Sequence, residues 1–152
     1  MMNVTAYTDG ACRISNPGLC ACAFVVFNGK ADSEGKLVGP FEERFRHGRF
    51  LGTPYTNNYA EYHGVIMLLE WMEGLGYSGC EIWCDSQLVV KQVNCEWRVK
   101  ENLAELCAKV FGLLHKTNST LKWLRGHDGN LGNEIADEIC NEVLDREQGK
   151  SA

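Results

Sequence analysis

The sequence predicts an α/β fold in which one mixed β-sheet of five strands carries α-helices on both faces. Three observations lead to this expectation. Three strand-like stretches follow one another at the start of the chain, the apolar spacing then changes to a helical period, and two further short strands alternate with helices. A chain of 152 residues with 45% hydrophobic and 23% charged residues is large enough to bury the core of one such domain.

The first three strands are expected at residues 3–9, 20–28 and 36–46. The second stretch is almost entirely apolar, as in a strand covered on both faces, and Asn28-Gly29 marks the turn that follows it. In the third, charged residues separate Phe41 from Phe45, which indicates a half-exposed edge strand. Strands that follow one another directly are typical of an antiparallel meander.

Helices and short strands alternate in the rest of the chain. An apolar stripe from Val65 to Met72 marks a helix at about 57–75, which Gly74 and Gly76 end. The remaining elements are expected to be a strand at 80–84, a helix from Ser86, a helix at about 100–115, a strand at 120–124 and a helix at about 130–146. We therefore expect one domain over residues 1–146 and a short polar tail over residues 147–152.

Composition and the start of the chain narrow the class of protein. No apolar run approaches the roughly 20 residues of a membrane-spanning helix. The first residues lack the basic and apolar regions of an export signal. We therefore expect a cytoplasmic protein with no membrane partner.

Eight cysteines raise the question of disulfides or metal binding. Cys80 and Cys84 flank one predicted strand, and Cys20 and Cys22 alternate along another, so neither pair bridges easily. Free thiols that act as small buried apolar groups are the expectation. A soft-metal pair formed by Cys20 and Cys22 stays open, although no second pair lies at the spacing of a zinc finger.

The distribution of charge leaves nucleic-acid binding open. A net charge of −5 counts against it for the chain as a whole. Residues 85–126, however, hold seven Lys or Arg against four acidic residues, whereas residues 127–152 hold two against seven. Divalent cations bound beside the acids would add positive charge there. A solvated helical face is the alternative reading of the basic segment.

Four acidic residues stand in separated segments whose local contexts suit metal-dependent phosphodiester chemistry: Asp9, Glu61, Asp85 and Asp137. Asp9 and Asp85 each end a predicted strand, and open sheets bind ligands at the carboxyl ends of strands. Glu61 lies on the inward face at the start of its helix, where a carboxylate needs a metal or hydrogen bonds. Gathered carboxylates form an oxygen-only site that selects Mg²⁺ or Mn²⁺ over Zn²⁺, which is typical of a two-metal nuclease. The alternative is that Asp9 and Asp85 cap the turn and the helix that follow them.

Five motifs, in order along the chain, carry a resemblance to a known family. They are Tyr7-Thr8-Asp9-Gly10-Ala11, Asn16-Pro17-Gly18, Thr56-Asn57-Asn58-Tyr59-Ala60-Glu61, Cys84-Asp85-Ser86-Gln87 and a last motif that runs from Gly126-His127-Asp128-Gly129-Asn130 to Asn133-Glu134-Ile135-Ala136-Asp137. Over about residues 3–144 the chain resembles type 1 ribonuclease H. The resemblance implies an RNase H-like fold and an endonuclease that cuts the RNA strand of RNA/DNA hybrids, leaving 5′-phosphate and 3′-hydroxyl products.

By the same resemblance, Asp9, Glu61, Asp85 and Asp137 are the ligands of two Mg²⁺ ions, for which Mn²⁺ would substitute. Two ions about 3.5–4 Å apart would bridge the scissile phosphate, deliver hydroxide in line and stabilise the leaving 3′ oxygen. His127 matches the mobile histidine of the family, which is thought to assist proton transfer or product release. A surface loop histidine is the alternative.

The resemblance also implies a set of substrate contacts. Asn16, Asn57, Asn58 and Gln87 would reach the minor groove of a hybrid, where the 2′-hydroxyl distinguishes RNA from DNA. Amide side chains both donate and accept hydrogen bonds, which suits these contacts. Thr56 would hold a phosphate of the DNA strand. Turn and cap roles are the alternative, since Asn16 stands in a good turn sequence and Thr56 or Asn57 is a good N-cap.

Two departures from the family pattern bear on substrate binding. Six residues separate Asp9 from Asn16, one more than the pattern has, so the placement of Asn16 is open. The basic, Trp-rich insert with which some members grip the DNA strand has no room here. Trp97, with Arg98 and Lys100, is expected to form a reduced contact with the DNA strand, and a core position is the alternative for Trp97. The missing insert predicts a stronger salt dependence of activity than in relatives that carry it.

Three rival functions remain. A non-catalytic module that binds hybrid or duplex RNA would have no physical need for four converging acids. Another nuclease on the same scaffold, such as a 3′→5′ exonuclease or a junction resolvase, would lack the Asn57-Asn58 pair beside Glu61. A thiol-metal protein would hold stoichiometric zinc. In the leading interpretation the chain is a monomer with no obligate protein partner, and its substrate is an RNA/DNA hybrid.

Overall fold

The computed structural model describes residues 3–125 and 129–149, and within them the chain forms five strands and four helices in the expected order. The elements are β1 (Val4–Arg13), β2 (Gly18–Ala31), β3 (Leu37–Tyr55), α1 (Asn57–Leu75), β4 (Cys80–Cys84), α2 (Gln87–Val93), α3 (Glu101–Lys116), β5 (Thr120–Trp123) and α4 (Leu131–Glu147). Among these residues, no helix is both long and apolar enough to cross a membrane. The predicted α/β fold is confirmed.

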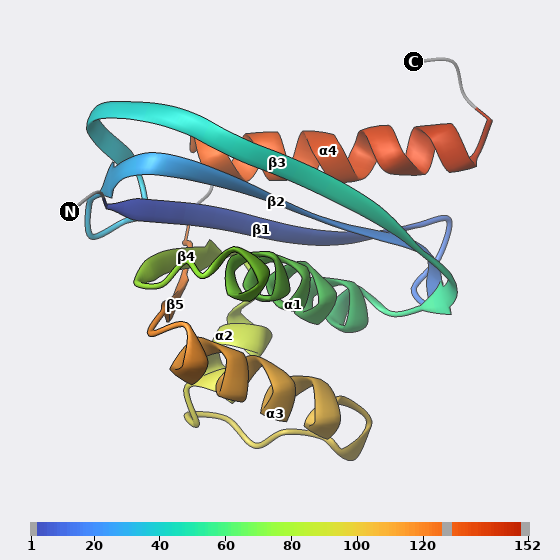
Figure 1. The fold of residues 1–152 in the computed structure, drawn as a ribbon. Coiled ribbons are helices and arrows are strands. Elements are labelled where there is room, and N and C mark those ends of the chain that lie inside the picture. The colour runs from blue at the N-terminus through green and yellow to red at the C-terminus, as the bar shows by residue number, and fades with distance from the viewer. Residues whose placement is uncertain (1–2, 126–128, 150–152) are drawn as a thin grey trace.

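The five strands form one mixed sheet in the order β3-β2-β1-β4-β5. β1, β2 and β3 pair antiparallel, as the predicted meander requires, whereas β4 pairs in parallel with both β1 and β5. Figure 1 shows α4 on one side of the sheet and α1 on the other, with α2 and α3 beyond α1. β3 forms one edge and is exposed along most of its length, as its charged sequence predicted.

β2 lies between the two helical layers, and its alternate residues face different helices. Cys22, Phe24 and Val26 belong to the large apolar cluster that includes the buried side of α1. Ala21 and Ala23 point the other way and pack in the clusters that contain α4 residues. This alternation explains why the segment is almost entirely apolar, since both of its faces are covered.

The first three strands are longer than the sequence predicted. β1 continues to Arg13 rather than ending at residue 9, and β3 extends to Tyr55 rather than residue 46. The added segments lack a regular alternation of apolar and polar residues, and they become strands because they pair with β2 along its length. Gly74 lies inside α1, which ends at Gly76, where a φ of 71° suits a residue without a Cβ.

The expectation of free thiols is wrong for two of the eight cysteines. Cys12 of β1 and Cys20 of β2 form a disulfide. They are direct partners in the antiparallel register, with Cα atoms 4.2 Å apart. Cross-strand partners bring their side chains together in a way that neighbours along one strand cannot. The other six cysteines are free, and all except Cys95 are buried, as expected for small apolar side chains.

The backbones of α1 and β1 touch through two glycines. A Cβ on Gly10 of β1 would overlap the carbonyl carbon of Ala60, and a Cβ on Gly64 of α1 would lie 2.8 Å from the carbonyl oxygen of Asp9. These neighbours are backbone atoms, which cannot move aside as the end of a flexible side chain can. The two glycines therefore allow α1 to lie directly against β1 beside Asp9.

Replacement of Gly10 by Ala should lower the free energy of unfolding by about 2–4 kcal/mol, because the added methyl group forces α1 away from β1. Urea unfolding followed by circular dichroism measures the change. Gly74→Ala is the matched control, since a Cβ there meets nothing within 4 Å. That substitution should raise the stability by up to about 1 kcal/mol through helix propensity. Equal effects of the two substitutions would show that the close approach does not constrain the fold.

Candidate active site

Asp9 and Asp85 lie side by side where β1 and β4 run in parallel. The last paired residues of these strands are Thr8 and Cys84. Asp85 therefore follows directly after the end of β4, while Asp9 occupies the adjoining position within β1. The predicted juxtaposition of the two carboxylates is present.

Capping does not explain either aspartate. β1 continues beyond Asp9 as far as Arg13 without a turn, so the expectation that Asp9 ends its strand is also wrong. The N-cap of α2 is Ser86 rather than Asp85, and its Oγ accepts a hydrogen bond from the Val89 N–H at 3.3 Å. Neither carboxylate therefore serves as the turn cap or helix cap that the sequence left as an alternative.

Glu61 of α1 joins this pair. Its carboxylate, that of Asp85 and the thiol of Cys84 each offer an atom within 4.8 Å of the others. Glu61 Oε1 and Asp85 Oδ1 are buried and have no hydrogen-bond partner among the described residues. Buried carboxylate oxygens without partners are unfavourable unless a cation or a proton compensates them. The two orphaned oxygens therefore fit a bound divalent cation.

The sulfur beside these oxygens does not change the class of metal. Burial, and then the charge of Glu61, hold the pKa of Cys84 well above its usual range, so its thiol stays neutral. The soft-metal pair considered for Cys20 and Cys22 is wrong, because Cys20 is held in the disulfide. Burial also raises the pKa of Cys22 to about 12. The available ligands are carboxylate oxygens, which suit Mg²⁺ or Mn²⁺.

Asp137 enters the site from α4. It is exposed, and its charge is one of those that raise the pKa of Asp9. Asn141, one turn further along the helix, donates from Nδ2 to Asp137 Oδ2 at 3.4 Å. Four acids from β1, α1, β4 and α4 thus converge, as the sequence predicted.

The start of α4 is tied to β1 through the turn that precedes β3. Asn130, the N-cap of α4, donates from Nδ2 to the carbonyl oxygen of Gly35 at 2.9 Å. The hydroxyl of Tyr7 in β1 donates to the same oxygen at 2.6 Å. Gly132 lies so close to the Tyr7 ring that a Cβ would overlap it. These contacts hold the carboxylate of α4 at the end of the sheet where the other three acids lie.

The carboxylates repel one another in the absence of a cation. Asp9 is only 6% exposed. Burial, followed by the charges of Asp85 and Asp137, raises the pKa of Asp9 to about 8. Burial and the charges of Asp9 and Asp85 likewise hold the pKa of Glu61 well above its usual range. Because burial and repulsion disfavour the ionised carboxylates at neutral pH, a bound cation would stabilise them by offsetting their negative charge.

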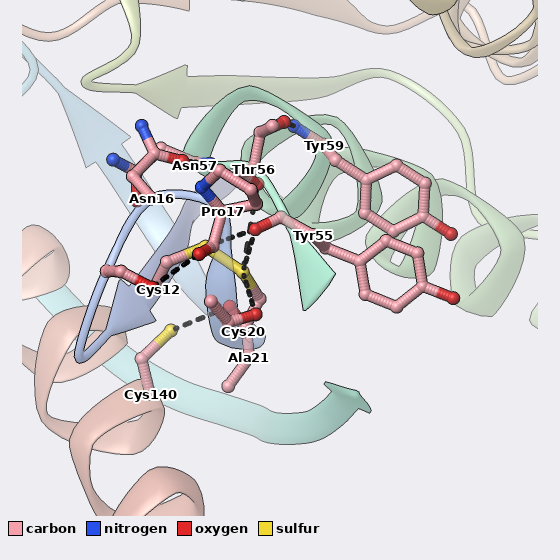
Figure 2. Close-up of a disulfide and its surroundings, with 12 residues drawn as sticks. Cys12, Asn16, Pro17, Cys20, Ala21, Tyr55, Thr56, Asn57, Tyr59 and Cys140 are labelled. Atoms are coloured by element: carbon pink, nitrogen blue, oxygen red, sulfur yellow. Dashed lines mark hydrogen bonds between the residues drawn. A yellow bond between two sulfur atoms is a disulfide. The ribbon is translucent and has the colours of Figure 1, made fainter. Parts of the chain in front are cut away.

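The predicted substrate residues Asn16 and Asn57 lie next to each other. The Oδ1 of Asn16, in the exposed loop between β1 and β2, accepts the N–H of Asn57 at 3.0 Å. Figure 2 shows their two side-chain nitrogens turned to the same side. Thr56 is the N-cap of α1, and its Oγ1 accepts the N–H of Tyr59 at 3.1 Å. The extra loop residue therefore does not separate Asn16 from the start of α1, and of the two capping candidates it is Thr56 that caps.

The remaining predicted contact residues stand on different elements of the chain. Asn58 is half-buried in the first turn of α1, and Gln87 begins α2. Trp97 is 45% exposed, so the core alternative for this side chain is wrong. His127 lies outside the described residues, and its role stays a prediction.

Sequence reasoning missed the cross-link that closes the loop carrying Asn16. Cys12 and Cys20 flank the turn sequence, and their separation of eight residues fits partners on two strands of a hairpin. That signal was present, but it depends on β1 continuing past Asp9, which the apolar pattern did not show.

The chain is similar in sequence to the proteins of one known family. Residues 1–145 match the RNase H family. Ribonuclease HI of Halobacterium salinarum is 34% identical over 142 residues, which cover 93% of this chain and 64% of the relative. Ribonuclease H of Polynucleobacter asymbioticus is 31% identical over 94% of this chain and 90% of its own.

Solved structures show the same similarity in three dimensions. The crystal structure of RNase H1 from Halobacterium salinarum has a TM-score of 0.73 and 32% identity, covering 95% of this chain and 98% of that one. LC11-RNase H1, solved in complex with an RNA/DNA hybrid, has a TM-score of 0.76 and 27% identity, covering 96% of this chain and 99% of that one.

The raised pKa of Asp9 predicts a stability that depends on both pH and divalent cations. An unfolded chain loses the Asp9 proton near pH 4, whereas the folded chain retains it up to about pH 8. The contribution to stability is therefore complete below about pH 4 and is lost as the pH rises through 8. In EDTA, the free energy of unfolding should fall by about 1–3 kcal/mol between pH 5.5 and 8.5.

Urea unfolding at the two pH values measures this fall, and millimolar Mg²⁺ at pH 8.5 should reverse it by binding the folded state. Asp9→Asn should show a smaller fall, because the variant lacks the titrating group. A wild-type stability that does not change with pH or with Mg²⁺ would count against a repulsive carboxylate cluster.

Proposed function

This chain belongs to the ribonuclease H family, and from that premise we propose that it is a metal-dependent endonuclease that hydrolyses the RNA strand of RNA/DNA hybrids. The products proposed are a 5′-phosphate and a 3′-hydroxyl end. A relative with the same fold, LC11-RNase H1, has been solved with an RNA/DNA hybrid bound, which supports this class of substrate.

The observation that carries the proposal is the convergence of Asp9, Glu61, Asp85 and Asp137, with buried oxygens of Glu61 and Asp85 that no described residue satisfies. Tertiary structure keeps these acids together although their charges repel. A module that only bound nucleic acid would gain nothing from that repulsion, and phosphate groups would be repelled by it. Cation-assisted phosphodiester hydrolysis uses such a cluster to hold its metal ions.

The four carboxylates would hold two Mg²⁺ ions, and Mn²⁺ would replace them. Bound divalent cations supply a Lewis-acid charge that activates water and stabilises the leaving oxygen. The chain supplies the ligand positions through elements that are fixed before substrate arrives: β1, the start of α1, the end of β4 and α4. Because Glu61 and Asp85 are already aligned, little reorganisation is needed on binding.

Selection for RNA is assigned to the amides beside the carboxylates. Asn16 uses its Oδ1 on the Asn57 N–H, which leaves its Nδ2 able to donate to a 2′-hydroxyl. Asn57 and Asn58, in the first turn of α1, and Gln87, at the start of α2, are the other amide groups proposed to contact the hybrid. His127 would assist proton transfer or product release.

The proposal is tested by cleavage of an end-labelled RNA strand within an RNA/DNA hybrid, with Mg²⁺ and with EDTA. Single-stranded RNA, RNA/RNA and DNA/DNA serve as comparison substrates. Internal cuts in the hybrid RNA strand that require Mg²⁺ are the expected result. Binding of hybrid without cleavage would favour a binding module, and release of single nucleotides from one end would favour an exonuclease.

Asp9→Asn should reduce hybrid cleavage by about a thousand-fold, because it removes a negative ligand and with it several kcal/mol of transition-state stabilisation. Steady-state rates on a short hybrid measure this loss. Glu105→Gln, which changes an exposed carboxylate on α3, is the matched control and should cleave at the wild-type rate. Comparable activity of Asp9→Asn and wild type would remove Asp9 from the proposed site.

Cleavage at a fixed hybrid concentration should fall between 50 and 200 mM salt, because phosphate contacts made by Arg98 and Lys100 release counterions on binding and added salt opposes that release. Plots of log kcat/KM against log salt concentration give the slope. Arg98→Ala should reduce that slope by about one, whereas Arg146→Ala, near the end of α4, should leave it unchanged. A rate that is constant across this range would contradict the reduced-contact interpretation.

A further inference from the structure

The Cys12–Cys20 disulfide lies at the base of the loop that carries Asn16. Cys12 belongs to β1 and Cys20 to β2, and the bond closes the loop between them at the point where the two strands are direct partners. Figure 2 shows the disulfide beneath Asn16 and next to the chain that leads from Tyr55 into α1. The cross-link therefore joins the two strands from which one predicted substrate contact extends.

The same disulfide lies against the segment that carries the other predicted contacts. Cys20 Sγ lies 3.1 Å from the carbonyl oxygen of Tyr55, and Cys12 Sγ lies 3.5 Å from it. Tyr55 ends β3, and Thr56, the next residue, caps α1. Above this contact, Asn16 accepts the Asn57 N–H at 3.0 Å. The loop and the start of α1 thus contact each other at two points: the disulfide sulfurs lie against the Tyr55 carbonyl, and the Asn16 amide bonds the Asn57 N–H.

The loop does not hold its shape through packing of its own. Ile14 has a φ of 76° and a side chain that is 81% exposed. A β-branched residue rarely adopts this left-handed conformation, and persists in it only where the surrounding structure enforces it. Within the loop, the Ser15 hydroxyl donates to the Pro17 carbonyl. The ends of the loop are held by the disulfide, by the pairing of Arg13 with Leu19, and by the Arg13 guanidinium, which donates to Asp145, Asn141 and Gln148.

We propose that the Cys12–Cys20 disulfide is a redox-controlled positioning element, which presets Asn16 against the start of α1 for hybrid binding and loses that effect when it is reduced. The inference rests on the proposed function for its substrate. It adds a control that acts on binding, since none of the four carboxylates lies within the closed loop.

The chemistry is thiol–disulfide exchange with a small thiol such as glutathione. Cys12 is partly exposed and Cys20 fully buried, so the thiolate of the reductant attacks Cys12 Sγ. The S–S bond breaks, its electron pair leaves on Cys20 Sγ, and that sulfur takes up a proton. A second glutathione thiolate attacks the sulfur of the glutathione bound to Cys12, and Cys12 leaves as a thiolate that takes up a proton. The products are two protein thiols and one glutathione disulfide. Glutathione disulfide drives the reverse reaction.

The reduced pair is also accommodated by its surroundings. The Tyr55 carbonyl oxygen, which lies beside both sulfurs, accepts a hydrogen bond from a thiol. Reduction therefore leaves no buried donor without a partner at this point, and the fold persists while the covalent link is lost. Such a pair switches between two tolerated states, as a redox-responsive element requires.

The test compares hybrid cleavage by the full chain before and after reduction, with the thiol state counted in each sample. Alkylation in denaturant should label six cysteines before reduction and all eight after it. Reduction should raise KM for the hybrid about 3- to 10-fold, because the loop must be ordered on binding. The kcat should change by less than about twofold, since the carboxylates stay in place.

Variants separate the disulfide from other effects of thiols. The double substitution Cys12→Ser and Cys20→Ser should have the high KM of the reduced protein and no response to reductant. Cys95→Ser, which changes the exposed free thiol after α2, should respond as wild type does. Asn16→Ala should raise KM and remove most of the effect of reduction, because the two changes act on the same contact. If the double variant fails to fold, wild type that has been reduced and alkylated under native conditions replaces it.

Amide hydrogen exchange over residues 13–19 gives a readout that does not depend on activity, and exchange should be faster after reduction. Hybrid cleavage with an unchanged KM in protein shown to be reduced would overturn the proposal. Labelling of all eight cysteines even after treatment with glutathione disulfide would also overturn it. If neither redox state cuts any hybrid while loop exchange still changes, the proposed function has failed and the control of loop order stands.

Discussion

The contact between the backbones of α1 and β1 is the constraint on which the site depends. Gly10 and Gly64 have no side chain where the two elements touch, so the helix can lie against the strand without an intervening layer of side chains. Glu61 stands between these contacts on α1 and is thereby brought to Asp9. Larger residues at the two positions would leave the same helix and the same strand, but the carboxylates would no longer share one site.

Repulsion between the carboxylates opposes the close arrangement that core packing imposes on them. Burial and mutual repulsion raise the pKa values of Asp9 and Glu61, and two carboxylate oxygens have no hydrogen-bond partner among the described residues. The apolar clusters on both sides of the sheet supply the stability that holds the acids in place. Such a local conflict is typical of a functional site, where the compensating charge comes from a ligand.

The residue proposed to contact substrate and the carboxylates proposed to hold metal stand on different kinds of structure. Asp9, Glu61 and Asp137 stand on β1, α1 and α4, and Asp85 directly follows β4, whereas Asn16 stands on the exposed loop between β1 and β2. The Cys12–Cys20 bond joins the two strands from which that loop extends. A change at the disulfide can therefore act on substrate contacts without disturbing the metal ligands.

Sequence by itself determined the fold class, the order of the elements and the acids that converge, because apolar spacing and local motifs report which face of each element is buried. It did not determine the length of β3, the cap of α2 or the pairing of Cys12 with Cys20. Those depend on which strand lies opposite which, and a strand with an irregular polar pattern, such as residues 47–55, forms only when a partner is present. Tertiary structure alone decided that Asp9 lies inside its strand, that Gly10 and Gly64 are contact points, and that two cysteines eight residues apart face each other.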